Sequence, residues 1–558
     1  MPRSRLSLEV LEDRYLLSTL IVSNNLDDGS AGSLRAEVAA AASGDTISFN
    51  QSLSGSTINL DPTKGEILIN TDLSIIGLGA ANLAVNGQNS SRVFEVAAGT
   101  TATISGLSIE NGKASGSGGG ILIDGGTVTI SDCALTGNTS GFNGGGISND
   151  GNLTIRDSIF TNNSAHRDGG AIVAGGTLLV SGCLISDNFA GFDGGGITEY
   201  GTLTVTDSST ISGNNGGSYG GGIRNVGGTL TVSNFSTISG NSSSFSGGGI
   251  YSDFGGTVIV SNSSTISDNS SLFGGGISIL NGTLTVSNST LSANQALQGG
   301  GINTAGTVTI SNSSTISNNT ANLFGGGIIN YGTLNVSDST VCGNIAPWGA
   351  DIKDFGLTTL TNSDVCIINQ GMTTTTISSS SSTSVFGQVV TFTAMVSPIV
   401  FLGQAPTGTV TFLLDGSTPL GTSSLDGSGK TMLSVPKLSV GSHTISASYS
   451  GDANFIASTS AVFTQTVLSA QQELWLIINQ VTDLVTKGIL DSGNGNAMIV
   501  KLNNAISSLN RGNTIAGDNQ MNAFLNQTSA FLKAGKLDSL DAQMLIDGID
   551  SAIVAALG

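Results

Sequence analysis

Residues 220–241 read GGGIRNVGGTLTVSNFSTISGN, and close variants of this unit follow one another along the middle of the chain. The isoleucine that ends the glycine run recurs about every 26 residues, a period typical of architectures in which each repeat packs against its neighbours. A further, degenerate copy reads GADI at residues 349–352. The regular isoleucines are Ile121, Ile147, Ile172, Ile197, Ile223, Ile250, Ile277, Ile302 and Ile328.

The pattern inside the unit identifies the architecture. Apolar and polar residues alternate in TLTV at residues 229–232, which is typical of a half-buried strand and excludes a helix face. Each unit therefore holds about three short strands, near GGGI, TLTV and TIS, separated by Gly, Ser and Asn turns. Stacking such strands in one direction gives a parallel β-helix, which we expect over residues 26–370 with regular repeats at 118–344. The Ala-rich residues 34–42 predict a helix, capped by Ser33, over the open first coil.

One asparagine lies three residues after the apolar residue of each third strand. Stacked amides can donate and accept along such a column and so satisfy turn backbone that would otherwise be buried without a partner. We therefore interpret the column as structural rather than as a binding site. Its members are Asn138, Asn163, Asn188, Asn214, Asn241, Asn269, Asn294, Asn319 and Asn344.

The repeat also places the cysteines. Cys133 and Cys183 share one column two coils apart, roughly 9.6 Å, which is too far for a disulfide. Cys342 and Cys366 each follow an aligned glycine by ten residues. They therefore stack on successive coils about 4.8 Å apart, and only this pair could bond. Neither histidine shares a ligand-spaced motif with a cysteine, so we expect no metal site and no cofactor.

The composition excludes several function classes. The 558 residues include 80 glycines and 38 Asp and Glu against 18 Lys and Arg, which gives a net charge of −20. Nucleic-acid binding is disfavoured, because neutralising phosphates requires clustered Lys and Arg. The 38% of hydrophobic residues disfavours disorder. No apolar run reaches the roughly 18 residues that a transmembrane helix requires.

The best catalytic constellation is Asp168 and Asp193, with His166 and Arg167 beside the first. Each aspartate directly precedes a glycine run, so the two stack one coil apart. Two carboxylates about 5 Å apart can act as acid and nucleophile in a retaining glycosidase. Against this, no Ca²⁺-ligand cluster, second basic group or aromatic platform accompanies the pair in the sequence. The same column elsewhere carries Ser117, Asn143, Tyr219, Ser246, Phe273, Gln298 and Phe324, which is typical of a permissive outward turn.

Two further side-chain patterns, of threonines and of aromatic residues, could indicate a binding face. Threonines form an outward column from Thr127 to Thr333 and partly fill a second, which resembles the ice-binding face of β-helical antifreeze proteins. Because threonine is favoured on any exposed β face and Leu179, Ile259 and Asn335 interrupt the second column, ice binding ranks third among our hypotheses. Aromatic residues before the glycines drift in register, so we expect them to pack over the turn. They are Phe142, Phe192, Phe245, Phe273 and Phe324.

The period changes after the repeats stop near Gly371. Short alternating strands over residues 371–468 predict a β-sandwich, in which we interpret His443 as a solvated strand residue. From about Ala470 the apolar spacing is helical. Within residues 469–558 a pattern recurs at an offset of 47, which predicts two helix pairs in a small bundle.

Several stretches resemble known bacterial families. GGAI at residues 169–172 with FTNN at 160–163 resembles the passenger repeats of polymorphic outer-membrane adhesins. GSLRAEV at 32–38 is similar to the CSLREA-type start of extracellular right-handed β-helix proteins of the choice-of-anchor kind. LEDRYLLS at 11–18 resembles the LEPR-XLL segment of large surface and secreted proteins, which implies export through residues 1–25.

The second half of the chain resembles two more modules. PTGTVTF at residues 406–412 and YSGDANF at 449–455 resemble bacterial Ig-like domains of the Big_3 type, which implies a spacer or adhesion unit. The last segment resembles the FIMAH-type helical module of bacterial extracellular proteins.

Together these observations predict a mainly β protein: a right-handed, pectin-lyase-like parallel β-helix, an Ig-like β-sandwich and a small α-helical bundle. We expect an exported bacterial protein at the cell surface or outside the cell, with a structural or adhesive role. Its partner would be a surface ligand such as a polysaccharide or a host or neighbouring cell, and not a nucleic acid. The alternative is a carbohydrate-active enzyme, a polysaccharide lyase or glycosidase, that uses Asp168 and Asp193.

Overall fold

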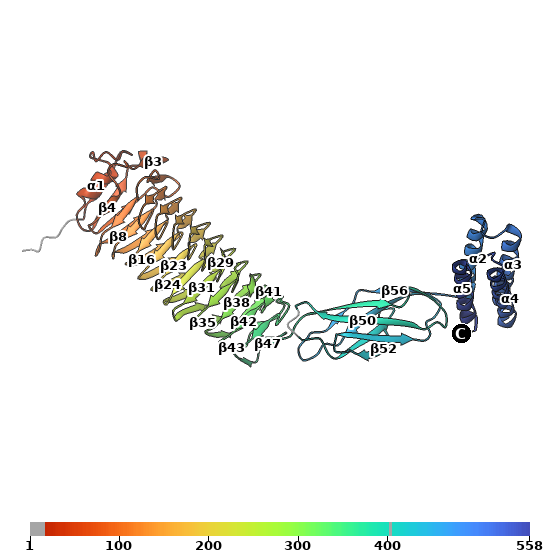
Figure 1. Ribbon diagram of the computed structural model, residues 1–558. Coiled ribbons are helices and arrows are strands. Elements are labelled where there is room, and N and C mark those ends of the chain that lie inside the picture. The colour runs from red at the N-terminus through yellow and green to blue at the C-terminus, as the bar shows by residue number, and fades with distance from the viewer. Residues whose placement is uncertain (1–16, 401–403, 558) are drawn as a thin grey trace, which may run out of the picture. The chain divides into compact units, whose positions relative to one another are not determined.

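The computed structural model describes residues 17–400 and 404–557 (Figure 1). The chain divides into two compact units, residues 1–370 and 371–558. Most of the LEDRYLLS segment, on which the expected export signal rests, lies outside the described residues.

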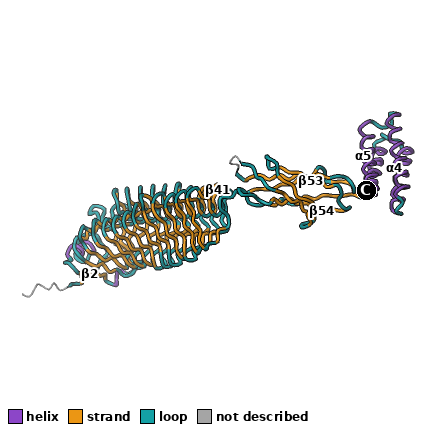
Figure 2. The backbone as a smooth tube through the Cα atoms, turned by 90° about the horizontal axis from the view of Figure 1, so that it is seen from below, coloured by secondary structure: helices purple, strands orange, loops and turns teal. Residues whose placement is uncertain are grey.

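The first unit is a parallel β-helix, as predicted. Three long parallel sheets of 14, 12 and 13 strands run along it, and Figure 2 shows their strands stacked coil upon coil. The 14-stranded sheet runs from β1 (Thr19–Val22) to β46 (Leu357–Thr361), and the 13-stranded sheet from β3 (Ser56–Asn59) to β47 (Asp364–Val365). Ile, Leu and Val columns from all three sheets fill one continuous core.

The 12-stranded sheet, which we call the glycine sheet because its regular strands follow the glycine runs, carries the features that matter below. Its strands pair in perfect repeat register, with Ile223 opposite Ile250 and Ile250 opposite Ile277. The strands are β4 (Ile67–Ile69), β7 (Phe94–Val96), β11 (Ile121–Ile123), β15 (Ile147–Asn149), β19 (Ile172–Ala174), β23 (Ile197–Glu199), β27 (Ile223–Val226), β31 (Ile250–Asp253), β34 (Ile277–Ile279), β38 (Ile302–Thr304), β42 (Ile328–Asn330) and β45 (Ile352–Asp354).

The expectation of three strands per coil was incomplete. A fourth parallel sheet of 6 very short strands runs from β10 (Lys113–Ala114) to β30 (Ser242–Ser243). Each strand has 2 residues and follows the asparagine column. Such short strands cannot be predicted from the alternation of apolar and polar residues, because two residues are too few to show it, and polar residues and a turn surround them.

A short helix, α1 (Leu34–Ala40), caps the first coils. The Ser33 side chain accepts a hydrogen bond from the backbone N–H of Ala36 at 3.3 Å. Leu34 and Val38 join the core of the β-helix. Arg35 pairs with Asp27 at 2.7 Å and donates to the carbonyl of Glu66, directly before β4. The helix therefore covers the first strand of the glycine sheet, which would otherwise present unpaired backbone.

The second unit begins with two sheets that form the predicted sandwich, and all their strand pairs are antiparallel except the parallel pair of β49 and β56. Phe392, Phe412, Tyr449 and Phe455 are buried in it. One sheet contains β48 (Thr373–Ser379), β50 (Val390–Pro398) and β53 (Lys430–Val435). The other contains β49 (Thr383–Val385), β56 (Phe463–Leu468), β54 (Gly441–Tyr449), β51 (Thr409–Leu414) and β52 (Thr418–Ser424), with β55 (Ser458–Thr459) paired to β54.

The interpretation of His443 as solvated was wrong. Its ring is buried, with Nδ1 3.1 Å from a carboxylate oxygen of Asp415 and Nε2 2.8 Å from the carbonyl oxygen of Ser439. The hydrogen bond to Asp415 raises the pKa of His443, helped by the Ser439 carbonyl. Both ring nitrogens face acceptors, so the sandwich favours the charged imidazolium.

Four helices complete the second unit, in the two pairs that the internal repeat predicts. They are α2 (Ala470–Thr486), α3 (Ser492–Asn510), α4 (Thr514–Lys533) and α5 (Ser539–Leu557). Their apolar faces, including Leu474, Met498, Phe524 and Leu545, form one core. Among the described residues, no helix combines the length and the apolar character needed to cross a membrane.

Candidate functional site

The asparagine column lies inside the β-helix. In Asn241, both the backbone N–H and the side-chain Nδ2 donate to Oδ1 of Asn269, at 2.9 and 3.0 Å. Nδ2 of Asn241 also donates to the carbonyl of Ile211 at 2.9 Å. Every member from Asn138 to Asn319 repeats the donation to the next coil. Because all its members are buried, the column serves the fold and offers nothing to a ligand.

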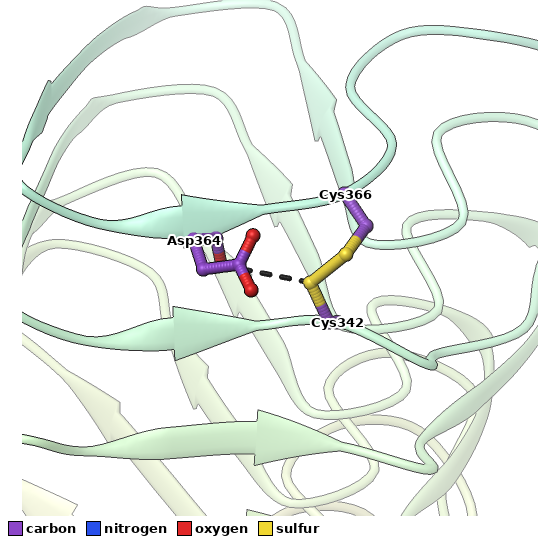
Figure 3. Close-up of side chains that lie close together, drawn as sticks. All are labelled: Cys342, Asp364 and Cys366. Atoms are coloured by element: carbon purple, nitrogen blue, oxygen red, sulfur yellow. Dashed lines mark hydrogen bonds between the residues drawn. A yellow bond between two sulfur atoms is a disulfide. The ribbon is translucent and has the colours of Figure 1, made fainter.

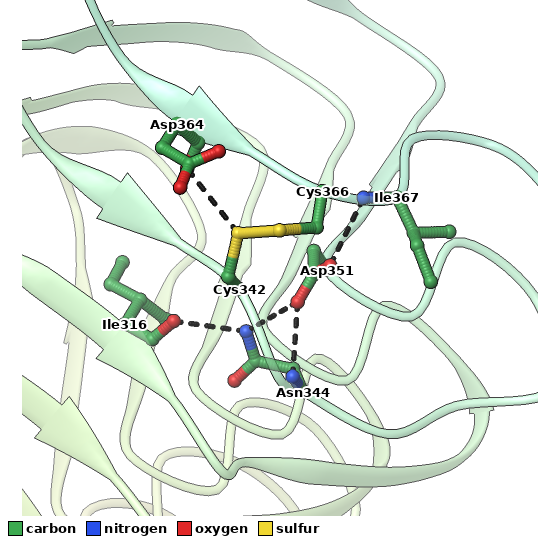
Figure 4. The surroundings of a disulfide bond; sticks show 7 residues. All are labelled: Ile316, Cys342, Asn344, Asp351, Asp364, Cys366 and Ile367. Carbon is green, nitrogen blue, oxygen red and sulfur yellow. Dashed lines mark hydrogen bonds between the residues drawn. A yellow bond between two sulfur atoms is a disulfide. The ribbon is translucent and has the colours of Figure 1, made fainter.

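The ladder ends on a carboxylate instead of an amide. The backbone N–H and Nδ2 of Asn344 both donate to Oδ1 of Asp351, at 3.0 and 2.9 Å (Figure 4). The other oxygen of Asp351 accepts from the backbone N–H of Ile367 at 3.0 Å. Asp351 belongs to the degenerate GADI copy, so the departure from the repeat falls where the column needs a different partner.

A disulfide joins Cys342 and Cys366 beside this ladder end, with Cα atoms 5.2 Å apart (Figures 3 and 4). Cys133 and Cys183 are free and buried, and burial raises the pKa of the Cys133 thiol to about 11. Asp364 lies next to the disulfide, its carbonyl oxygen 3.6 Å from Sγ of Cys342. Both sulfurs are already bonded to each other, so this group lacks the thiolates that a metal would require.

The outer face of the glycine sheet is lined by three columns of side chains. The central column follows each core isoleucine by one residue, and strand alternation directs it away from the core. The preglycine column directly precedes each glycine run, and the far column follows each isoleucine by three residues. From coil 193–200 to coil 324–331, the central column consists of Thr198, Arg224, Tyr251, Ser278, Asn303 and Ile329. The preglycine column consists of Asp193, Tyr219, Ser246, Phe273, Gln298 and Phe324. The far column consists of Tyr200, Val226, Asp253, Leu280, Ala305 and Tyr331.

Asp168 and Asp193 do lie side by side in the preglycine column, paired across adjacent coils. Asp168 is buried and accepts from the Tyr200 hydroxyl at 3.4 Å. Burial raises the pKa of Asp168 above its ordinary value, although Arg167 and Arg224 oppose this effect. The structure does not bring His166 to the pair with a hydrogen bond: it lines a separate hollow with Phe189 and Phe192.

Arg167 points its guanidinium over the Phe142 ring, 5.2 Å from the ring centre, and forms no ion pair with either aspartate. The basic group that does pair with Asp193 is Arg224, whose Nη1 binds its carboxylate. Nη2 of Arg224 binds Asp253 at 3.0 Å. One guanidinium therefore joins a carboxylate of the preglycine column to a carboxylate of the far column. This second basic group was not expected from the sequence.

Aromatic rings surround the same guanidinium. The Arg224 Cζ atom lies 5.5 Å from the ring centre of Tyr219 and 5.7 Å from that of Tyr251. The two tyrosine rings are 4.7 Å apart, and Phe245 meets Tyr219 edge-on at 5.4 Å. Phe273 continues the series, 5.3 Å from Phe245. The expectation that no aromatic platform accompanies the acidic pair was therefore wrong.

These rings open onto a pocket of about 210 Å³, which we call the aromatic pocket. Tyr251 and Ser278 are buried even though they face away from the core, because the flanking columns cover them. The Ser278 hydroxyl accepts from Oγ of Ser246 at 2.9 Å. The lining consists of Tyr219, Phe245, Ser246, Tyr251, Phe273, Ser278, Ile279, Leu280, Asn303 and Ala305. It combines apolar walls with a few polar groups, as small-molecule sites do.

The aromatic residues before the glycines thus divide into two groups. Phe142, Phe192 and Phe245 stand two residues before the glycine runs and remain 48%, 52% and 45% exposed, so they cover the turn only in part. Phe273 and Phe324 stand in the preglycine column instead. The difference of one residue in their distance from the glycine run therefore places the two groups in different outward columns, with different surroundings.

A buried carboxyl, Glu199, was also missed. It ends β23 at an inward corner where the previous coil carries Ala174 and the next coil carries Asn225, and it accepts from the backbone N–H of Gly201. Its other oxygen has no hydrogen-bond partner among the described residues. Burial raises the pKa of Glu199 to about 8. A protonated carboxyl can imitate the side-chain amide of Asn225, which the next coil has at this position.

Comparison with known proteins agrees with these modules. Residues 92–242 match the family described as a right-handed β-helix region, and residues 376–468 match the bacterial Ig-like domain of group 3. No curated protein and no solved structure matches the chain. The predicted fold class is thereby confirmed: the chain is similar to right-handed β-helix regions in one part and to bacterial Ig-like domains in another, a combination that fits a bacterial surface or secreted protein.

Proposed function

We propose that this protein is an exported adhesin whose β-helix binds a carbohydrate at the aromatic pocket without cleaving it. The observation that carries this proposal is the pocket itself, in which four aromatic rings stand beside hydroxyl and amide groups on one continuous sheet face. Rings bury apolar area at little entropic cost, while the neighbouring polar groups set the orientation of a ligand.

The ion pairing around Arg224 favours binding over hydrolysis. A retaining glycosidase needs one carboxylate that is free to attack the sugar while the other donates a proton. Asp193 is held by Arg224, which is itself held by Asp253, and this network is largely shielded from solvent. Releasing Asp193 would break its ion pair with the partly buried guanidinium of Arg224, which is costly.

The test is a glycan array probed with the full chain and with a Tyr251→Ala variant. Tyr251 contacts both Tyr219 and Arg224, so its loss should weaken binding at least about tenfold. Phe235→Ala is the matched control, because Phe235 is 69% exposed and does not line the pocket. Equal losses in both variants, or no glycan bound by the wild type, would contradict the proposal. Labelling of intact cells tests export, and an intracellular location would overturn it.

One observation favours the alternative, a carbohydrate-active enzyme. Asp168 is a buried carboxyl with a raised pKa, one coil from Asp193, as a general acid beside a second carboxylate would be. Plant and algal polysaccharides should be screened for new reducing ends or unsaturated products. Turnover that disappears in Asp168→Asn, with the fold intact, would establish this alternative in place of the adhesin.

A further inference from the structure

The sheet face that contains the aromatic pocket is not an open channel. On the side toward the N-terminus, Arg224 lies one coil before Tyr251 in the central column. Its guanidinium reaches Asp193 in the preglycine column and Asp253 in the far column, and so ties the two flanking columns together. Tyr200 makes a similar connection one coil earlier through its hydrogen bond to Asp168.

A second connection closes the side toward the C-terminus. The Tyr331 hydroxyl, from the far column, donates to Oε1 of Gln298 in the preglycine column at 3.2 Å. The connection crosses the central column, where Ile329 is fully buried although alternation directs it outward. Tyr331 also stacks on Phe355 of the next coil, with ring centres 5.2 Å apart, and this contact supports its ring from behind.

Between these two connections only Tyr251, Ser278 and Asn303 of the central column remain to line the pocket. They occupy three successive coils, so the open stretch is about 10 Å long at the usual spacing of parallel strands. A polysaccharide running along the β-helix would have to cross Arg224 at one end and Tyr331 at the other. A ligand can therefore enter the pocket only from above the sheet.

The lining also restricts the charge of the ligand. None of the residues that line the pocket carries a charge at neutral pH. Arg224, the cation that faces the pocket tyrosines, already shares its guanidinium between two carboxylates. A sugar acid would therefore find no free cation in the pocket and would approach a chain with a net charge of −20.

We propose that the aromatic pocket receives one uncharged sugar ring, at a chain end or on a branch, and does not bind the interior of a long or acidic polysaccharide. This inference rests on the proposed carbohydrate binding and specifies the form of the ligand. It follows from the two side-chain connections that bound the pocket and from the absence of charge in its lining.

The test uses isothermal titration of the full chain with oligosaccharides of one to six units. Suitable probes are gluco-, manno-, galacto- and N-acetylglucosamine series, with a galacturonate series as the charged counterpart. We expect at least one neutral series to bind with affinities that agree within about threefold from two to six units, and no binding of galacturonates. An affinity that rises tenfold or more over the same lengths, or preferential binding of galacturonates, would overturn the inference while the proposed binding function stands.

A pair of variants examines the closed end directly. Tyr331→Ala removes the connection to Gln298 and should let longer chains extend toward Phe324, so that six units bind at least about fivefold more tightly than two. Tyr331→Phe keeps the ring stacked on Phe355 and should retain the length independence of the wild type. Identical length profiles in all three proteins would overturn the inference. If no series binds to the wild type, the proposed function falls and the inference falls with it.

Discussion

The inner asparagine column and the outer preglycine column belong to the same repeat, yet they differ completely in how strictly they repeat. Inside, each amide is buried and its partner is the amide of the next coil. Any other side chain would therefore leave hydrogen-bonding groups of both neighbouring coils without a partner. Outside, successive coils place Asp193, Tyr219, Ser246 and Phe273 at equivalent positions. The solenoid thus concentrates its structural constraint inside and leaves the outer face free to diversify.

The largest effect should come from breaking the inner column. Asn241→Ala leaves the backbone N–H and Nδ2 of Asn214 and the carbonyl of Ile211 without their partner, deep in the solenoid. We expect the free energy of unfolding to fall by about 3 kcal/mol or more. Urea denaturation followed by circular dichroism measures it.

The control for this experiment is an asparagine on the outer face of the same solenoid. Asn303 in the central column is only partly buried, and Asn303→Ala should cost less than about 0.5 kcal/mol. Comparable losses in the two variants would show that the ladder does not carry the stability assigned to it.

The second largest loss of stability should come from the disulfide at the end of the inner column. Removing the disulfide with Cys342→Ser and Cys366→Ser should lower the free energy of unfolding by about 3 kcal/mol, since the bond closes a loop over a separation of 24 residues. Reductant should destabilise the wild type and a Cys133→Ala, Cys183→Ala variant alike, but not the serine variant. Thiol titration of the unfolded, unreduced chain should detect only Cys133 and Cys183. Detection of all 4 cysteines would refute the bond.

A smaller effect should depend on pH. Glu199 has an ordinary pKa of 4.5, and burial raises it to about 8 in the folded chain. Between these values the unfolded chain releases the proton and the folded chain keeps it, so stability contributed below pH 4.5 is lost as the pH rises toward 8. Glu199→Gln should remove this slope and stabilise the protein at pH 8 by about 1–3 kcal/mol. Thermal melts of both proteins from pH 5 to pH 8, about the range between the two pKa values, measure this pH dependence.

Asp150→Asn provides the matched control for Glu199, because Asp150 is an exposed carboxyl two coils earlier, directly after β15 of the same sheet. Its melting temperature should follow the pH profile of the wild type. If Glu199→Gln also follows that profile, the buried carboxyl does not bind a proton in the way described.

The last prediction concerns ice binding, for which we expect no effect. On the 14-stranded sheet, Thr229 pairs with Thr257 and Thr202, but Asn152 interrupts this outward threonine column, and Leu179, Ile259 and Asn335 interrupt its neighbour. Purified protein should therefore show no thermal hysteresis. A measurable hysteresis that disappears in Thr231→Leu, and not in Thr464→Leu on the sandwich, would restore the ice-binding hypothesis.

The inner column and the placement of the cysteines could be deduced from the sequence because both depend only on register. A fixed period determines which residues stack, and this was enough to place Cys342 and Cys366 on adjacent coils and to group the asparagines. The fourth sheet escaped notice because its strands are only 2 residues long. The burial of His443 was not predicted because one of its acceptors, Asp415, follows β51, whereas the other, Ser439, precedes β54.

The aromatic pocket could not be deduced in the same way. Its groups come from columns that the period treats as independent, and the contacts run diagonally, as from Arg224 to Asp193 and Asp253. A repeat fixes which residues lie above one another, whereas side-chain length and direction decide which columns touch. The available signal was that Arg224 and Tyr251 occupy successive positions of an outward column that carries Ser148, Val173 and Thr198 on the three preceding coils and Ser278 on the following one.

The asparagine ladder also has a direction. Every link runs the same way, with N–H groups aimed at the next coil and carbonyl oxygens at the previous one, from Asn138 to Asn344. Aligned amide dipoles therefore sum along the axis and place their positive end at the last coil, as an α-helix does at its N-terminus. There the carboxylate of Asp351 receives both donors of Asn344. Asp351, which stands where the regular repeat has its last glycine, thus ends the ladder: its negative charge faces the positive end of the dipole, and its other oxygen accepts from the backbone N–H of Ile367.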